Sequence, residues 1–190
     1  MSKKTFKATV AACVLALGAA GIAQAKSPVP GKPGTQNIVD FAIAANSDGP
    51  TEGKLDTLLT AATCDYFDEA VVNLLSGNKR HTLFAPTDDA FEQLGLRPDN
   101  VCATFEADPS GLFNILAYHV TEGRRFSNSV FNKRSVKMVG MLNDQYIMTL
   151  GGKDPTITDN KGRTIRPVAG LINLNASNGV IHVIDSVLLP

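Results

Sequence analysis

The sequence has few of the residues from which enzymes and metal centres are usually built. Its 190 residues include only three cysteines and three histidines. No histidine pair has the His-x-x-x-His spacing of a zinc-binding helix, and neither a Cys-x-x-Cys pair nor a Gly-x-Ser-x-Gly elbow occurs. We therefore predict a protein that is not an enzyme, with no catalytic residue, no metal site and no cofactor.

Long apolar runs are also missing once the N-terminus is passed. Residues 1–25 have Lys3, Lys4 and Lys7, then the apolar run VAACVLALGAAGIA, then a small-x-small site ending at Ala25. This order is typical of a secretory signal peptide. An uncleaved anchor is the weaker alternative, because a membrane helix needs roughly 20 apolar residues. We expect no transmembrane segment and a periplasmic or extracellular protein, free or associated with the cell surface.

Excess charge is absent too. Removing residues 1–25 leaves 15 basic and 18 acidic residues, a formal charge of −3, which argues against nucleic-acid binding. The same cleavage removes Cys13 and leaves Cys64 and Cys102, an even pair in an exported chain. Such a pair predicts a disulfide. Closing this loop would stabilise the fold by about 4 kcal/mol in the chain-entropy model.

Patterning divides the rest of the chain into a linker and one domain. Residues 26–36 are rich in proline and glycine and predict an extended linker, so the domain is expected at 37–190. Helical periodicity dominates 38–76, with Cys64 in a break, and recurs at 88–94 and 110–117. Strand patterns occupy 81–85 and then 135–139, 145–150, 156–159, 171–176 and 180–189. Helices followed by antiparallel strands predict an α+β fold.

The segment HTLFAPTDDAF carries the most conspicuous acidic pair. Pro86 ends the strand, Thr87 is placed to cap the next helix, and Asp88 and Asp89 fall in its first turn. A catalytic carboxylate pair would need partners that converge on a substrate, and the sequence offers none. We interpret the pair as architecture.

Three segments, in order, resemble the fasciclin (FAS1) domain family. TLFAPTDDAF resembles its first signature, LFNILAYHVTEG its central Tyr-His motif, and ASNGVIHVIDSVLLP its second signature. The resemblance covers about residues 38–190 and implies a wedge or sandwich of β-strands flanked by a helical lobe. Independently, Asn178 and Gly179 between two β-rich runs predict a hairpin, because both residue types tolerate positive φ.

The family resemblance also implies a broad role. Members are mostly extracellular adhesion or matrix proteins, and bacterial relatives are secreted or surface-associated. Animal members contact integrins through the Tyr-His pair and an Asp-Ile pair. Here Asn173 and Leu174 stand at the latter positions, and without that carboxylate the resemblance does not extend to integrin-type recognition.

Two groups of residues are candidates for contact with a partner. Tyr118 and His119 either pack within the fold or take part in an interaction. The run GRRFSNSVFNKRSVK is basic, and it is either a solvated face or a surface for an anionic polysaccharide or envelope. Its candidate residues are Arg124, Arg125, Lys133 and Arg134.

A binding role of another class stays open. Some fasciclin-domain proteins bind apolar small molecules such as carotenoids, and Met138, Met141 and Met148 with their apolar neighbours are either core or an adaptable apolar surface. His81 and His182 are expected to be hydrogen-bonded strand residues. The sequence therefore predicts a secreted, non-catalytic adhesion protein bound to a cell-surface or matrix protein or polysaccharide. The alternative is an extracellular carrier of a hydrophobic small molecule such as a carotenoid or lipid.

Overall fold

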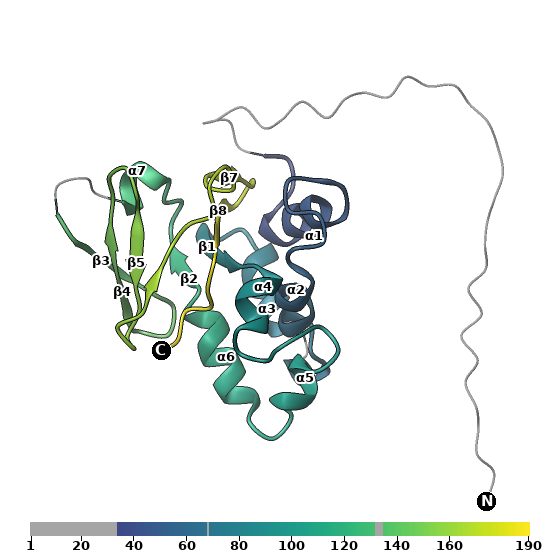
Figure 1. Ribbon diagram of the computed structural model, residues 1–190. Coiled ribbons are helices and arrows are strands. Elements are labelled where there is room, and N and C mark those ends of the chain that lie inside the picture. The colour runs from purple at the N-terminus through teal and green to yellow at the C-terminus, as the bar shows by residue number, and fades with distance from the viewer. Residues whose placement is uncertain (1–33, 68, 132–134) are drawn as a thin grey trace, which may run out of the picture.

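The computed structural model describes residues 34–67, 69–131 and 135–190 (Figure 1). The helices are α1 (Ile38–Asp48), α2 (Asp56–Ala62), the 3-10 helix η1 (Asp65–Phe67), α3 (Ala70–Ser76), α4 (Asp88–Glu92), α5 (Val101–Thr104), α6 (Pro109–Ala117) and α7 (Ser127–Val130). The strands are β1 (His81–Pro86), β2 (Val120–Glu122), β3 (Lys137–Gly140), β4 (Tyr146–Leu150), β5 (Thr156–Thr158), β6 (Thr164–Ile165), β7 (Leu174–Asn175) and β8 (Gly179–Ile184).

The strands form two four-stranded sheets, which we call the inner sheet (β2-β1-β8-β7) and the outer sheet (β3-β4-β5-β6). The inner sheet lies between the outer sheet and a lobe of helices (Figure 1). This arrangement confirms the α+β class and the sandwich of strands beside a helical lobe. The signal peptide and most of the linker expected at residues 1–36 lie outside the described residues.

One pairing differs from the expected antiparallel arrangement. β1 and β8 pair in parallel, with Leu83 opposite Ile181 and Ala85 opposite Val183. Every residue of both strands is buried. Parallel strands need a long connection and are usually covered on both faces, and both conditions hold here. Local sequence patterns do not carry the direction in which such distant strands meet.

Successive side chains of β1 and β8 point to opposite faces of the inner sheet and so contribute to two hydrophobic cores. Leu83 and Ala85 of β1 and Ile181 of β8 face the helices in the first core, while Phe84 and Ile184 face the outer sheet in the second. The first core also receives buried side chains from α1, α2, α3 and α6. The second core is completed by Val139, Ile147, Ile157 and Ile165 of the outer sheet.

The turn before β8 forms the predicted hairpin, but the reason for its glycine differs from the predicted one. β7 and β8 pair antiparallel around Ala176 to Asn178. Neither Asn178 nor Gly179 has positive φ, so that part of the prediction is wrong. Glycine is needed at 179 because a Cβ there would lie 2.2 Å from the carbonyl oxygen of His81. Close backbone approach, not turn geometry, selects this residue.

The side chain of Asn178 joins three parts of the chain. Its Oδ1 accepts the N–H of Ile38 at 2.8 Å, at the start of α1. Its Nδ2 donates to the carbonyl oxygens of Leu75 (2.7 Å) and Gly77 (2.8 Å), at the end of α3. The buried amide thus satisfies backbone groups at two helix termini next to β8.

The cysteine pair expected from the sequence lies at disulfide distance. Cys64 follows α2 and Cys102 lies in α5, with Cα atoms 5.6 Å apart and sulfur atoms 2.04 Å apart. This Cα separation is within the usual range for a disulfide. The pair links α5 to the end of α2. Cys13 is outside the described residues.

We expect Asn178→Ala to lower the free energy of unfolding by about 3 kcal/mol, because it leaves two buried backbone groups and one partly buried backbone group without their partner. Asn143→Ala is the matched control, since Asn143 makes an exposed side-chain bond to Asn114. Its loss should be within about 0.5 kcal/mol. Urea unfolding of both variants measures the difference, and equal losses would contradict the role given to Asn178.

Candidate functional site

Tyr118 and His119 are buried, with 0% and 1% of their surfaces exposed, and Tyr118 belongs to the second core. The Tyr118 hydroxyl donates to the carbonyl oxygen of Tyr146 (2.8 Å) and accepts the N–H of Asn160 (3.1 Å). It therefore fastens two segments of the outer sheet to the end of α6. Burial raises the pKa of this phenol.

His119 is hydrogen-bonded through both ring nitrogens. Nδ1 donates to the carbonyl oxygen of Ile115 (2.7 Å), and Nε2 accepts the N–H of Leu188 (2.9 Å). Burial lowers its pKa from 6.5 to about 4. Of the two roles that the sequence left open, these contacts favour packing, since side chains so completely buried offer no surface to a protein or polysaccharide partner.

Two arginines of the predicted basic stretch, Arg124 and Arg125, lie in the described residues, and both donate hydrogen bonds to backbone carbonyl oxygens of the protein itself. Arg124 donates to the carbonyl oxygen of Ala176 at 3.2 Å and to Oδ1 of Asn175, and its guanidinium lies 5.8 Å from the ring centre of Phe126. Arg125 donates from Nε to the carbonyl oxygen of Glu122 at 2.8 Å. Both are partly buried. Lys133 and Arg134 lie outside the described residues.

His182 is a buried strand residue. Its Nε2 donates to the carbonyl oxygen of Arg125 (2.8 Å), and its Nδ1 accepts the N–H of Asn173 (3.2 Å). Burial lowers its pKa. Asn173 in turn accepts the N–H of Ser127 at 2.7 Å, so it holds the start of α7. His81, at the start of β1, is also buried, and burial lowers its pKa. Neither of its ring nitrogens has a hydrogen-bond partner in the described residues, so the expectation of a hydrogen-bonded histidine is wrong at this position.

Both aspartates lie in the first turn of α4, as expected, and one of them also caps a second helix. Thr87 Oγ1 accepts the N–H of Ala90 at 3.3 Å, as expected for the cap of α4. Asp88, however, caps α2: its carboxylate accepts the N–H groups of Thr57 (2.7 Å) and Asp56 (3.2 Å). Asp89 is exposed. Sequence reasoning placed both charges at α4 and missed this contact between segments 31 residues apart.

The methionine-rich segment does not form one apolar site. Met141, Val139 and Ile147 are buried in the second core. Met138 and Met148 instead face outward from β3 and β4, and Met138 is 63% exposed. The alternation of β-strand side chains separates residues that are neighbours in sequence.

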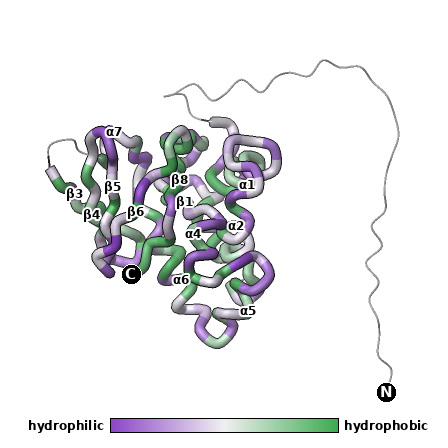
Figure 2. Tube along the Cα trace, in the orientation of Figure 1, coloured by the Kyte–Doolittle hydropathy of each residue, from purple (hydrophilic) through white to green (hydrophobic). Residues whose placement is uncertain are grey.

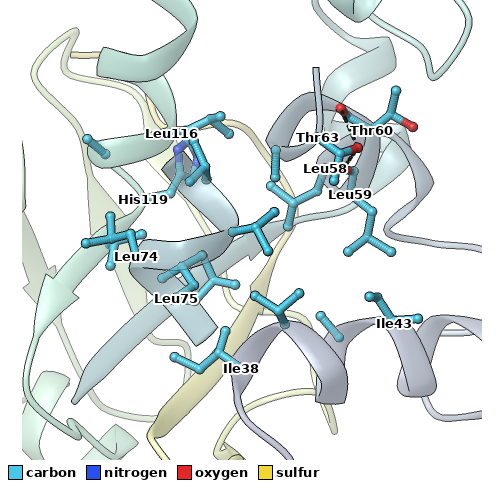
Figure 3. A pocket seen from close by; sticks show the side chains of 18 of the residues that line it. Ile38, Ile43, Leu58, Leu59, Thr60, Thr63, Leu74, Leu75, Leu116 and His119 are labelled. Atoms are coloured by element: carbon cyan, nitrogen blue, oxygen red, sulfur yellow. Dashed lines mark hydrogen bonds between the residues drawn. The ribbon is translucent and has the colours of Figure 1, made fainter. Parts of the chain in front are cut away.

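The structure places an apolar cavity of about 450 Å³ in the helical lobe (Figure 3). Its wall is built by α1, α2, α3 and α6 together with β1 and β2. The main apolar side chains are Ile38, Ala42, Leu58, Leu59, Val71, Leu74, Leu75, Leu83, Phe113 and Leu116. Figure 3 shows Thr60 and Thr63 together on one side of the cavity, across from Leu74 and Leu75.

Ionisable groups are scarce around this cavity. Among the described residues, only Asp56 and His119 of the lining can titrate, and no lysine or arginine is present. The His119 nitrogens are already hydrogen-bonded inside the fold. The sequence gave no direct sign of the cavity, because its walls are ordinary helical apolar residues that periodicity assigns to a core. No cluster of three or more potential metal ligands occurs in the described part of the chain.

Comparison with known proteins decides the family. The model of the fasciclin domain matches residues 55–190. The chain belongs to the fasciclin domain family. None of the helices in the described residues has the length and hydropathy to cross a membrane.

Relatives of this fasciclin domain include bacterial and animal proteins. It is 34% identical to protein sll1483 of Synechocystis sp. over 63% of this chain and 61% of that protein. It is 29% identical to uncharacterized protein sll1735 of Synechocystis over 80% and 97% of the two chains. It is 27% identical to transforming growth factor-beta-induced protein ig-h3 of Sus scrofa over 62% and 16%. The chain thus spans less than two thirds of sll1483 and of ig-h3.

A solved structure shows the same fold. It is a FAS1 domain pair from the insect cell adhesion molecule fasciclin I, which matches with a TM-score of 0.61 and 18% identity over 83% of this chain and 52% of that one. At this identity the match supports the fold alone. Family membership makes this chain a relative of adhesion proteins and leaves its own ligand to be inferred from its surfaces and cavities.

We expect Asp88→Asn to cost about 1–2 kcal/mol of stability and Asp89→Asn less than about 0.5 kcal/mol. The first loses the carboxylate that caps α2, and the second changes an exposed charge. Denaturant unfolding of the two single variants makes the comparison between adjacent positions. An equal effect, or a larger one at Asp89, would contradict the capping of α2 by Asp88.

Stability should fall as the solution becomes more acidic between about pH 6.5 and 4. The unfolded chain protonates His119 near 6.5, whereas burial holds the native pKa at about 4, so the unfolded state binds more protons in this window. Each such histidine removes about 1.4 kcal/mol per pH unit. Urea unfolding at pH 7.5, 6.0 and 5.0 measures the slope. Constant stability across these values would show that His119 is not held neutral.

Proposed function

We propose that this fasciclin domain is an exported, non-catalytic protein that binds an apolar small molecule in the cavity of its helical lobe. The observation that carries the proposal is the cavity itself, about 450 Å³ with walls made mainly of aliphatic side chains. The sequence alone ranks surface attachment first and carriage second. The cavity is the reason for reversing that order.

The physical driving force would be burial of apolar surface. Moving such surface out of water contributes roughly 25 cal/mol per Å², and the cavity volume lies within the range of roughly 300–1,000 Å³ of small-molecule sites. Ile43 and Phe113, two lining residues, are 49% and 40% exposed, so apolar surface continues to the outside. A ligand could enter there without crossing a polar barrier.

The remaining parts of the proposal rest on the sequence. Export depends on the signal peptide predicted at residues 1–25 and the linker at 26–36, with the domain at 37–190 as expected. The family match to residues 55–190 supports most of that domain range. The absence of catalysis is supported by the histidines, whose lowered pKa values follow from burial and not from a shared reaction centre.

A neutral fluorescent probe tests the cavity. N-phenyl-1-naphthylamine should brighten on binding, and Ala62→Phe should weaken its binding at least about 10-fold, because the ring fills the lining of α2. Ala70→Phe is the control, since Ala70 is exposed at the start of α3. Circular dichroism checks that both variants stay folded. Equal binding by all three proteins would remove the cavity as the site.

Attachment to a matrix or cell-surface protein is the second candidate. One specific observation favours it: the outward face of β3 and β4 carries exposed Met138, Tyr146, Met148 and Leu150, and parts of these strands are hydrophobic in Figure 2. All the exposed outward positions of these two strands lack charge. An apolar protein surface is the partner that such a face would fit.

Introducing charge on the outward face of β3 and β4 distinguishes a contact made by this face from one made by the basic stretch. Met138→Glu with Met148→Glu should reduce attachment to immobilised matrix proteins about 10-fold, whereas Asn73→Glu with Asn78→Glu, at exposed positions in and just after α3, should leave it unchanged. Added salt should have little effect on an apolar contact. Attachment that salt abolishes, and that Arg124→Gln with Arg125→Gln weakens, would instead assign it to the basic stretch and a polysaccharide.

A further inference from the structure

One border of the cavity is polar, and it comes from a single stripe of α2 and its end. Asp56, Thr60 and Thr63 recur at intervals of four and three residues, which puts them on one side of the helix. All three line the cavity, and Asp56 and Thr63 are exposed. In Figure 3, Thr60 and Thr63 lie side by side at this border. The polar stripe therefore meets whatever end of a bound molecule points outward.

The hydroxyl protons of the stripe are already used. Thr60 donates to the carbonyl oxygen of Asp56 at 2.8 Å, and Thr63 donates to the carbonyl oxygen of Leu59 at 2.9 Å. A hydroxyl has one proton and two lone pairs, so each threonine oxygen can still accept but no longer donate. Asp56 accepts Nδ2 of Asn46 through Oδ1 at 2.7 Å and retains Oδ2 as an acceptor.

Most donors around the stripe are engaged as well. The exception is the hydroxyl of Thr57, which has no partner but is buried and does not line the cavity. The backbone N–H groups of Asp56 and Thr57 are held by the Asp88 carboxylate. The Nδ1 proton of His119 goes to Ile115, and its other nitrogen accepts from Leu188. In the part of the chain that the structure describes, the lining has no lysine or arginine. The border thus offers hydrogen-bond acceptors and one negative charge, with no donor to match them.

From this we propose that the ligand of the cavity is an apolar molecule whose polar end donates a hydrogen bond, an alcohol or an ammonium group. The inference rests on the proposed function and specifies its ligand class. A carboxylate, ester or ketone brings only acceptors to a border that already has them, and a carboxylate also meets the charge of Asp56. Fatty-acid anions are the class that this border rejects.

Four straight-chain probes, each built on a ten-carbon chain, test the proposal. They are 1-decanol, decylammonium, methyl decanoate and decanoate, each used to displace N-phenyl-1-naphthylamine at pH 7.5 and 0.15 M salt. One neutral hydrogen bond corresponds to about 5-fold in affinity. We expect decanol and decylammonium to bind at least about 5-fold more tightly than methyl decanoate, and decanoate to bind most weakly.

The results distinguish the hypothesis of a donor-headed ligand from the broader hypothesis of an apolar carrier. Equal affinity for all four probes, or tighter binding of decanoate, overturns the donor-headed ligand and leaves the apolar carrier in place. If the fluorescent probe itself does not bind, both the donor-headed ligand and the apolar carrier are overturned. Tighter binding of decylammonium than of decanol that disappears in Asp56→Asn assigns the cation, and tighter binding of decanol than of decylammonium assigns the alcohol.

Matched variants locate the effect. Thr60→Val with Thr63→Val keeps side-chain shape and removes both acceptors, so decanol should bind about 5- to 10-fold more weakly while methyl decanoate is unchanged. Thr104→Val is the control, because Thr104 in α5 makes the same kind of bond, to the carbonyl oxygen of Asn100. A loss that is equal for decanol and methyl decanoate, or equal in the control, contradicts the proposal.

Discussion

The parallel pairing of β1 with β8 is the interaction on which the rest of the structure depends. Six residue pairs align, from His81 opposite Gly179 to Pro86 opposite Ile184, and the close approach at one end requires glycine. Both strands are buried on both faces, so each contributes to two cores at once. The two segments that resemble the family signatures contain most of these strands. The segments are far apart in sequence, and they lie side by side in the fold because β1 pairs with β8.

Polar contacts at the ends of this pair determine how the helices lie on it. Asn178, beside β8, holds the start of α1 and the end of α3, and Asp88, just after β1, caps α2. Directional bonds therefore fix three helices that also pack through aliphatic side chains. Helices held at their ends need not close completely over one another, and this offers a physical reason for a cavity between them.

The parts that the sequence predicted are those with local causes. Helical periodicity over 38–76, the Thr87 cap and the pairing of Cys64 with Cys102 were each predicted from residue type and spacing or from the proposed export signal. The parallel direction of β1 and β8 and the capping of α2 by Asp88 depend on which distant segments meet, which no local pattern encodes. The short elements β2, β6, α5 and α7 have too few residues to show a period.

The candidate site was less accessible to sequence reasoning than the fold. Tyr118, His119 and the arginines stand out by residue type, yet their polar atoms bind the protein's own backbone. The cavity is lined by leucine, isoleucine and valine, residues that look the same in sequence whether they fill a core or surround a space. Polar and charged side chains indicate a binding site here only after the structure shows which of their hydrogen bonds are already made within the protein.

The most direct test of the account is a methyl NMR titration of the folded protein with N-phenyl-1-naphthylamine. The account predicts that methyl signals of Leu58, Leu75 and Leu116, which line the cavity in the first core, shift with the probe. Signals of Ile147, Ile157 and Ile165, in the second core beyond the inner sheet, should stay in place. Shifts confined to the second core, or to Met138 and Met148 on the outer face, would contradict a binding cavity in the helical lobe.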